Sequence, residues 1–175
     1  MQNARPTASD ASWVDTARGT VSRDVFVEDA IYHLEVEKIF TSQWVFLAHE
    51  TELPNAGDFV ARNLGSAPVV VVRDDNGEIH VLLNSCRHRG AKVCRSESGN
   101  SRRFVCPYHG WTYRRSGELV TTTFDKHFPK DVDFQDLGLP RVPRVETHKG
   151  LIFGSWNEDV TPLSSFLGDF AWYLD

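Results

Sequence analysis

The chain has 175 residues, of which 41% are hydrophobic and 25% are charged, and its formal net charge is -5. This length fits a single domain with a sizeable core, and the acidic balance excludes the overall positive charge typical of nucleic-acid-binding proteins. No apolar run is long enough to span a bilayer and the first residues do not form a secretory signal, so we expect a cytoplasmic protein that does not bind membranes.

The first part of the chain predicts a polar tail followed by one helix. Residues 1–22 are small and polar, and we expect them to be poorly ordered unless they dock on another surface. Residues 23–43 form a helical arm, with a helix predicted at about 28–41 because apolar side chains recur there at helical spacing. These side chains belong to Tyr32, Val36, Ile39 and Phe40.

The middle of the chain, residues 44–157, predicts a domain of short strands. Apolar runs rich in β-branched and aromatic residues are separated by turn residues, and Asn76-Gly77 marks a hairpin. The predicted strands are 44–49, 58–64, 68–73, 78–84, 103–106, 111–114, 119–122, 141–148 and 151–156. Strands of this length and spacing favour an all-β sandwich or a small barrel.

Residues 158–175 predict a closing helix. Thr161 is suited to be its N-cap and Pro162 its first residue. Apolar residues then recur on one face, namely Phe166, Leu167, Phe170, Ala171 and Leu174. A stripe of this kind needs a partner surface to cover it.

Basic residues are concentrated between Arg87 and Arg115, where eight of them stand against a single acid, Glu97. They are Arg87, Arg89, Lys92, Arg95, Arg102, Arg103, Arg114 and Arg115. Two interpretations are open for this set: an ordinary solvated surface, or a face on which an acidic partner docks.

Two short motifs in this basic segment each combine a cysteine with a histidine. Cys86 and His88 form C-x-H in SCRHRG, and Cys106 and His109 form C-x-x-H in VCPYHGW. A glycine follows each histidine closely, and a backbone without a Cβ can approach a metal centre. Two thiolates and two imidazoles on two loop tips could therefore close on one centre.

The mixed composition of each motif separates two kinds of metal site. A structural zinc site usually takes its cysteines from one element and its histidines from another, whereas each motif here supplies one of each. A Rieske [2Fe-2S] centre binds both cysteines on one iron and both histidines on the other, which accounts for the mixing. The third cysteine, Cys94, is left over, and we expect it to be a buried or half-buried free thiol.

The motifs CRHRGAKVC and CPYHGWTY are flanked by the stretches IYHLEVEKIFTSQWVFLAHETELPNAGDF and RVETHKGLIFGSWNED. Together they resemble the N-terminal Rieske part of the large (alpha) subunit of bacterial aromatic-ring-hydroxylating dioxygenases, from about Arg23 to Asp175. The resemblance implies a mainly β Rieske fold of small antiparallel sheets with two cluster-binding loops, flanked by an N-terminal and a C-terminal helix. It also implies the ligand set: Cys86 and Cys106 on the inner iron, His88 and His109 on the outer iron.

The function implied by this resemblance is that of an oxidoreductase component in an NAD(P)H-dependent system. The cluster would pass electrons from a ferredoxin or reductase to a mononuclear Fe(II) that hydroxylates aromatic rings with O2. Two histidines and a carboxylate of a separate catalytic domain would hold that iron, so we assign no catalytic residue here and expect the chain to be inactive alone. His109 would hydrogen-bond an acid on the catalytic domain of a neighbouring alpha subunit, and a beta subunit is a further expected partner.

Two other functions stay open. A stand-alone Rieske ferredoxin would use the same ligands purely to carry electrons, although such proteins normally lack the helical flanks. A zinc-stabilised binding module would contain no iron. The histidines outside the motifs are His33, His49, His80, His127 and His148, and the nearest acid–histidine pair, in DKH at 125–127, lacks the spacing of a catalytic iron site.

Differences from the respiratory-chain Rieske proteins bear on the reduction potential. Ala91 and Tyr108 stand where those proteins place two disulfide-bonded cysteines, and Trp111 stands where they place a serine, while Tyr113 matches their tyrosine. Fewer donors to the cluster sulfurs stabilise the reduced state less, so we expect a potential near the low end of the Rieske range, roughly -150 mV.

Overall fold

The computed structural model describes residues 13–123 and 133–175, which form a mainly β chain. The strands are β1 (Val14–Asp15), β2 (Thr20–Val21), β3 (Val45–His49), β4 (Asp58–Leu64), β5 (Ala67–Arg73), β6 (Ile79–Leu83), β7 (Ser98–Asn100), β8 (Phe104–Val105), β9 (Thr112–Tyr113), β10 (Leu119–Thr121), β11 (Arg144–His148) and β12 (Leu151–Ser155). The helices are η1 (Arg23–Phe26), α1 (Asp29–Glu35), η2 (Val36–Phe40), η3 (Glu50–Glu52), η5 (Phe134–Leu137), α2 (Leu163–Leu167) and η6 (Gly168–Tyr173). In the described ranges, none of these helices has the length and apolar character needed to cross a bilayer.

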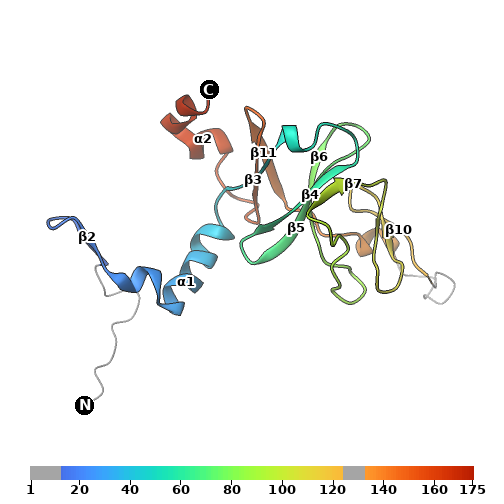
Figure 1. Cartoon of the computed structure of the whole chain (residues 1–175), viewed down its shortest axis with the longest axis horizontal. Helices are drawn as coiled ribbons and strands as arrows, with labels where there is room; N and C mark the ends of the chain where they lie inside the picture. The colour runs from blue at the N-terminus through green and yellow to red at the C-terminus, as the bar shows by residue number, and fades with distance from the viewer. Residues whose placement is uncertain (1–12, 124–132) are drawn as a thin grey trace, which may run out of the picture.

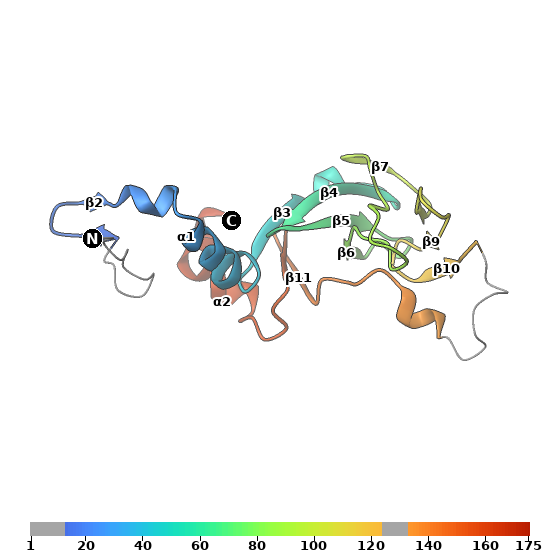
Figure 2. The same ribbon diagram turned by 90° about the horizontal axis from the view of Figure 1, so that it is seen from below.

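The strands pair antiparallel in small sheets, in the orders β1-β2, β6-β5-β4-β7, β10-β9-β8 and β11-β12-β3. The sheet of β8, β9 and β10 lies at one end of an elongated molecule, and α1 and α2 lie toward the other (Figures 1 and 2). The β1–β2 hairpin projects beyond α1, away from the sheets (Figure 1). This arrangement confirms the predicted small antiparallel sheets with an N-terminal and a C-terminal helix, and it places both helices toward the same end of the molecule.

β5 is an inner strand of the four-stranded sheet, and both of its faces are buried. Val70 and Val72 pack into one core together with Cys86 and Cys106. The other two valines of the run 69–72 pack into a second core, shared with β3 and β12. Because side chains alternate across a strand, one valine run serves both cores, and the two cysteines are held directly against the centre of the fold.

The C-terminal helix differs from its prediction at both ends. It begins at Leu163, and Pro162, whose ψ of 143° is not helical, occupies the N-cap position, so Thr161 is not the N-cap. The Thr161 carbonyl instead accepts a hydrogen bond from the Trp44 indole N–H (2.7 Å). The helix ends at Gly168, whose positive φ of 48° breaks the predicted continuous helix into α2 and η6.

Two segments form strands that the sequence did not predict. Part of the expected polar tail, residues 14–21, forms the β1–β2 hairpin, which turns at Gly19 with a φ of 64°. The small residues of β7 have little preference for a strand, and pairing with β4 holds them there. The predicted helix at 28–41 is confirmed, although its second half, Val36–Phe40, is π-helical.

Candidate metal centre

Cys86 opens a loop that we call loop 1, residues 85–92. The Cys86 N–H donates to the Ala91 carbonyl (2.9 Å), and the Gly90 N–H donates back to the Cys86 carbonyl (2.8 Å). Gly90 has a φ of 71°, which a residue with a Cβ adopts only at a cost. The cysteine side chain therefore lies at the base of a tight loop, and His88 lies at its tip.

Loop 2, residues 106–111, repeats this construction. The Cys106 N–H donates to the Trp111 carbonyl (2.7 Å), and the Gly110 N–H donates to the Cys106 carbonyl (2.9 Å). Gly110 has a φ of 72°, and it stands four residues after its cysteine, as Gly90 does. The two loops therefore have the same backbone hydrogen bonds and the same glycine position, although the histidine stands two residues after the cysteine in loop 1 and three residues after it in loop 2.

The loop tips bring the two histidines together. The ring centroids of His88 and His109 lie 4.6 Å apart, His88 stacks on Trp111 at 5.0 Å with an interplanar angle of 6°, and His109 stacks on Tyr108. His109 Nδ1 is buried without a hydrogen-bond partner in the described part of the chain. A buried ring nitrogen of this kind is costly unless it binds something, and a metal ion is the partner that imidazole most often takes.

The two cysteine sulfurs lie deeper than the histidines. Cys86 and Cys106 are each 2% exposed, and the Tyr113 hydroxyl lies 3.1 Å from Cys86 Sγ and accepts the Arg87 N–H (3.2 Å). Burial raises the pKa of the Cys86 thiol, the Tyr113 hydrogen bond opposes this, and the neighbouring Cys106 raises it further. Two thiolates could coexist there only beside a strong positive charge, which a metal centre supplies.

The pKa of His88 also suits a metal ligand. Partial desolvation of its ring, followed by the nearby charges of His109 and Arg89, lowers the pKa of His88. A lower pKa favours the neutral imidazole, which is the form that binds metals.

The way in which the loops share the donors suits two metal ions better than one. Each loop supplies one buried thiol and one histidine, whereas a structural zinc site usually takes its cysteines from one element and its histidines from another. A Rieske centre binds both cysteines on one iron and both histidines on the other. A separate group of possible ligands, Asp74, Glu78 and His80, lies in the described part of the chain.

The group of Asp74, Glu78 and His80 is explained by its own contacts. The Asp74 carboxylate accepts the backbone N–H groups of Asn76 and Glu78 (2.8 and 2.9 Å) and lies 2.9 Å from the His80 ring nitrogen. These contacts close the β5–β6 hairpin, which the Asn76-Gly77 signal predicted. His80 is therefore a hydrogen-bonded residue of the hairpin.

The other histidines lie away from the loops. His49 contacts Thr51 and the Lys149 carbonyl, and His33 packs beside Tyr32 on α1. His148 Nε2 is buried without a hydrogen-bond partner in the described residues and lies 3.3 Å from the Asp175 carboxylate. His127 and Asp125, the closest predicted acid–histidine pair, lie outside the described residues.

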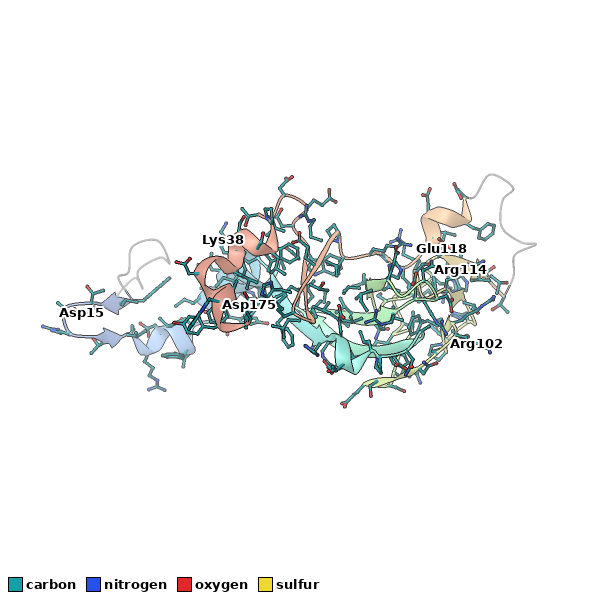
Figure 3. All side chains as sticks on the ribbon, turned by 90° about the horizontal axis from the view of Figure 1, so that it is seen from above. Asp15, Lys38, Arg102, Arg114, Glu118 and Asp175 are labelled. Atoms are coloured by element: carbon teal, nitrogen blue, oxygen red, sulfur yellow. The ribbon has the colours of Figure 1, made fainter. Side chains whose placement is uncertain are left out.

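The predicted basic face needs one correction. Arg115 is 7% exposed, donates to the Ser101 carbonyl (2.8 Å) and pairs with Asp75, so it fastens the β9–β10 turn to its neighbours and is not free to meet a partner. Arg102 and Arg103 are exposed, and in the part of the chain that the structure describes neither guanidinium has a partner. Arg114 pairs with Glu118 (3.4 Å), and Figure 3 shows both at the same end as Arg102.

Sequence reasoning missed one residue of the site and placed another correctly. Asn84 is 3% exposed and bonds the backbone of residues 93–94. The sequence did contain a signal for it, because Asn84 is a polar residue that ends the apolar run VLLN directly before the motif SCRHRG. The prediction for Cys94 is confirmed, because it is a buried free thiol.

Known proteins resemble this chain in sequence and in fold. The family model described as the Rieske [2Fe-2S] domain matches residues 43–135. Biphenyl 2,3-dioxygenase subunit alpha from Rhodococcus jostii (strain RHA1) is 43% identical over 165 residues, which cover 94% of this chain and 36% of that protein. N,N-dimethyl phenylurea N-demethylase subunit alpha from Sphingobium sp. (strain YBL2) is 44% identical over 159 residues, covering 90% and 35%.

A solved structure agrees with these relatives. Naphthalene 1,2-dioxygenase from Rhodococcus sp., bound to indole, superposes with a TM-score of 0.84 and 42% identity, over 89% of this chain and 36% of that one. The chain spans about a third of the length of the curated relatives that it matches.

Proposed function

The chain belongs to the Rieske [2Fe-2S] domain family, and from this premise we propose that it is the electron-transfer part of the alpha subunit of an aromatic-ring-hydroxylating dioxygenase. The observation that carries the proposal is the extent of the similarity to such subunits, which spans 94% of the chain and so includes both helical flanks as well as the loops. A stand-alone ferredoxin would give those flanks nothing to cover.

Four residues would hold the cluster. The buried Cys86 and Cys106 would bind the inner iron, and His88 and His109 at the loop tips would bind the outer iron, a division that the burial of the thiols supports. When bound, a [2Fe-2S] centre accepts and releases one electron at a time. The surrounding protein excludes water from the thiolates, while the histidines face the outside, where a partner can approach.

The helical end would face the remainder of the alpha subunit. Aromatic residues of α2 and η6 are exposed there, with Phe170 at 58%, Trp172 at 72% and Tyr173 at 73%, and the relatives continue well beyond the matched region. We accordingly take 23–43 as an arm, 44–157 as the cluster domain and 158–175 as the connection to a catalytic domain holding the mononuclear iron. Free cysteines fit a cytoplasmic location, where thiols stay reduced.

The electron donor, a ferredoxin or reductase, would dock at the cluster end. Reversing Arg102 and Arg103 to Glu should slow reduction by an acidic donor by roughly tenfold at low salt and flatten its salt dependence, because long-range attraction is lost. Stopped-flow reduction at two salt concentrations measures this. Reversal of Arg18 and Lys38 changes the charge equally at the other end and should leave the rate unaltered. If the Arg102 and Arg103 variant were reduced at the wild-type rate but formed a different oligomer, these arginines would instead belong to a contact between subunits.

Replacing Tyr113 by Phe should lower the midpoint potential of the cluster. The hydroxyl beside Cys86 Sγ stabilises the reduced state, which carries more negative charge, and its loss is worth about 1 to 2 kcal/mol, or roughly 40 to 90 mV for one electron. Protein-film voltammetry gives the shift. Tyr32→Phe on α1 is the matched control, and equal potentials for the Tyr113 variant and the wild type would show that the hydroxyl does not act on the cluster.

The oxygenase proposal is tested by exchange with a relative. A chimera that carries this chain in place of the matched region of biphenyl 2,3-dioxygenase subunit alpha should hydroxylate biphenyl, traced by labelled O2 in the ring. The chain alone, with Fe(II), O2, donor proteins and biphenyl, should become reduced and form no product. An inactive chimera, together with a free chain that could replace the ferredoxin of a dioxygenase system, would show that the chain is a stand-alone Rieske ferredoxin.

A further inference from the structure

We propose that Asn84 is a positioning residue that closes loop 1 and so holds Cys86 and His88 in place for the cluster. The inference rests on the cluster assignment and does not depend on the oxygenase role. It starts from a difference between the two loops in how their ends are joined, because their internal backbone hydrogen bonds are otherwise the same.

The ends of loop 2 are joined by a strand ladder. β8 and β9 pair directly on either side of it, with Phe104 opposite Tyr113 and Val105 opposite Thr112. Loop 1 lacks such a ladder in the described structure, because β6 ends at Leu83 and the next strand, β7, pairs with β4 instead. Something other than strand pairing must hold the two ends of loop 1 together.

The Asn84 carboxamide meets this requirement. Its Oδ1 accepts the N–H groups of Val93 (3.0 Å) and Cys94 (2.8 Å), and its Nδ2 donates to the Cys94 carbonyl (2.8 Å). We call these three bonds the Asn84 clamp. The Asn84 N–H also donates to the Pro68 carbonyl at the start of β5 (2.8 Å), which ties the clamp to the four-stranded sheet. One side chain thus joins residue 84 to residues 93–94 across the loop that carries both ligands.

Loss of the clamp should act on the ligands and not only on folding. The backbone bonds that remain inside loop 1 join Cys86 to Gly90 and Ala91, within the span that Asn84 closes, and do not fix where the loop leaves the sheet. His88 would then be steadied by its stacking on Trp111 of the other loop and by the bond from the neighbouring Arg87 N–H to the Tyr113 hydroxyl. Removal also leaves the Val93 and Cys94 N–H groups buried without an acceptor, which favours opening of this end.

The test compares three variants of the iron-loaded chain. Asn84→Leu keeps the shape and removes all three bonds, so iron should pass to a chelator roughly 10 to 100 times faster than from the wild type, and the EPR spectrum of the reduced cluster should change. Asn84→Asp retains the two acceptor contacts and should lose iron at an intermediate rate. Asn157→Leu removes two side-chain bonds far from loop 1 in sequence, one donated to the Ser42 carbonyl and one accepted from the Asp159 N–H, and should match the wild type in both measurements.

The outcomes separate this inference from the cluster assignment. Wild-type iron loss and an unchanged EPR spectrum in Asn84→Leu would overturn the clamp, however far the melting temperature falls. Should that variant not fold, Asn84→Asp decides in the same way, and hydrogen exchange in the wild type must show the Val93 and Cys94 amides protected. A wild-type chain without iron and sulfide would instead refute the cluster.

Discussion

Serine in place of Cys106 is expected to leave the purified chain almost without iron. The Cys106 sulfur lies in the core beside Cys86, and a serine hydroxyl ionises far less readily and binds iron weakly. Iron content should fall from about two atoms per chain by at least tenfold, together with the visible absorption of the cluster. Metal analysis and a visible spectrum measure both effects.

Cys94 provides the matched control for this substitution. It is also a buried free thiol of the same core, and its Sγ contacts only the Ser96 carbonyl among the hydrogen-bond partners described (3.5 Å). Cys94→Ser should keep its full iron content. Equal iron in both variants would remove Cys106 from the ligand set, and loss of iron in both would point to damage to the core instead of loss of a ligand.

Cysteine in place of His109 is expected to retain a cluster with a much lower potential. A thiolate adds a negative charge next to the outer iron, and clusters with four cysteines lie near -400 mV against about -150 mV for the lowest Rieske centres. One exchange should therefore lower the midpoint by roughly 100 to 200 mV. His33→Cys, on the exposed face of α1, should leave the potential unchanged. Equal midpoint potentials for His109→Cys and the wild type would contradict ligation by His109.

The two loops that carry the four candidate ligands could be predicted from the sequence because the information there is local. Each cysteine, histidine and glycine lies within a few residues of the others, and the loop hydrogen bonds run between positions four or five residues apart. The strands around the valine run were also predictable, since alternation and β-branching act over a few residues. The pairing of β7 with β4 depends on contacts between segments about 40 residues apart, and the Asn84 bonds span a whole loop of nine or ten residues, so residue patterns record neither.

The two errors have different origins. Arg115 resembles its exposed neighbours in sequence, and only the approach of Asp75 and the Ser101 carbonyl shows that it is buried. In α2, the apolar spacing suggested a longer helix, but Gly168 adopts a positive φ and ends it. Local preference was outweighed by tertiary contact in the first case and by glycine's backbone freedom in the second.

Analysis of iron, acid-labile sulfide and nitrogen ligation in the purified wild-type chain tests the central claim most directly. The chain should contain about two iron atoms and two sulfides. The EPR and electron–nuclear couplings of its reduced state should reveal two histidine nitrogens at one iron, and one in His109→Cys. A chain that contains one zinc ion and no sulfide, or a reduced cluster without nitrogen couplings, would contradict the assignment of Cys86, His88, Cys106 and His109.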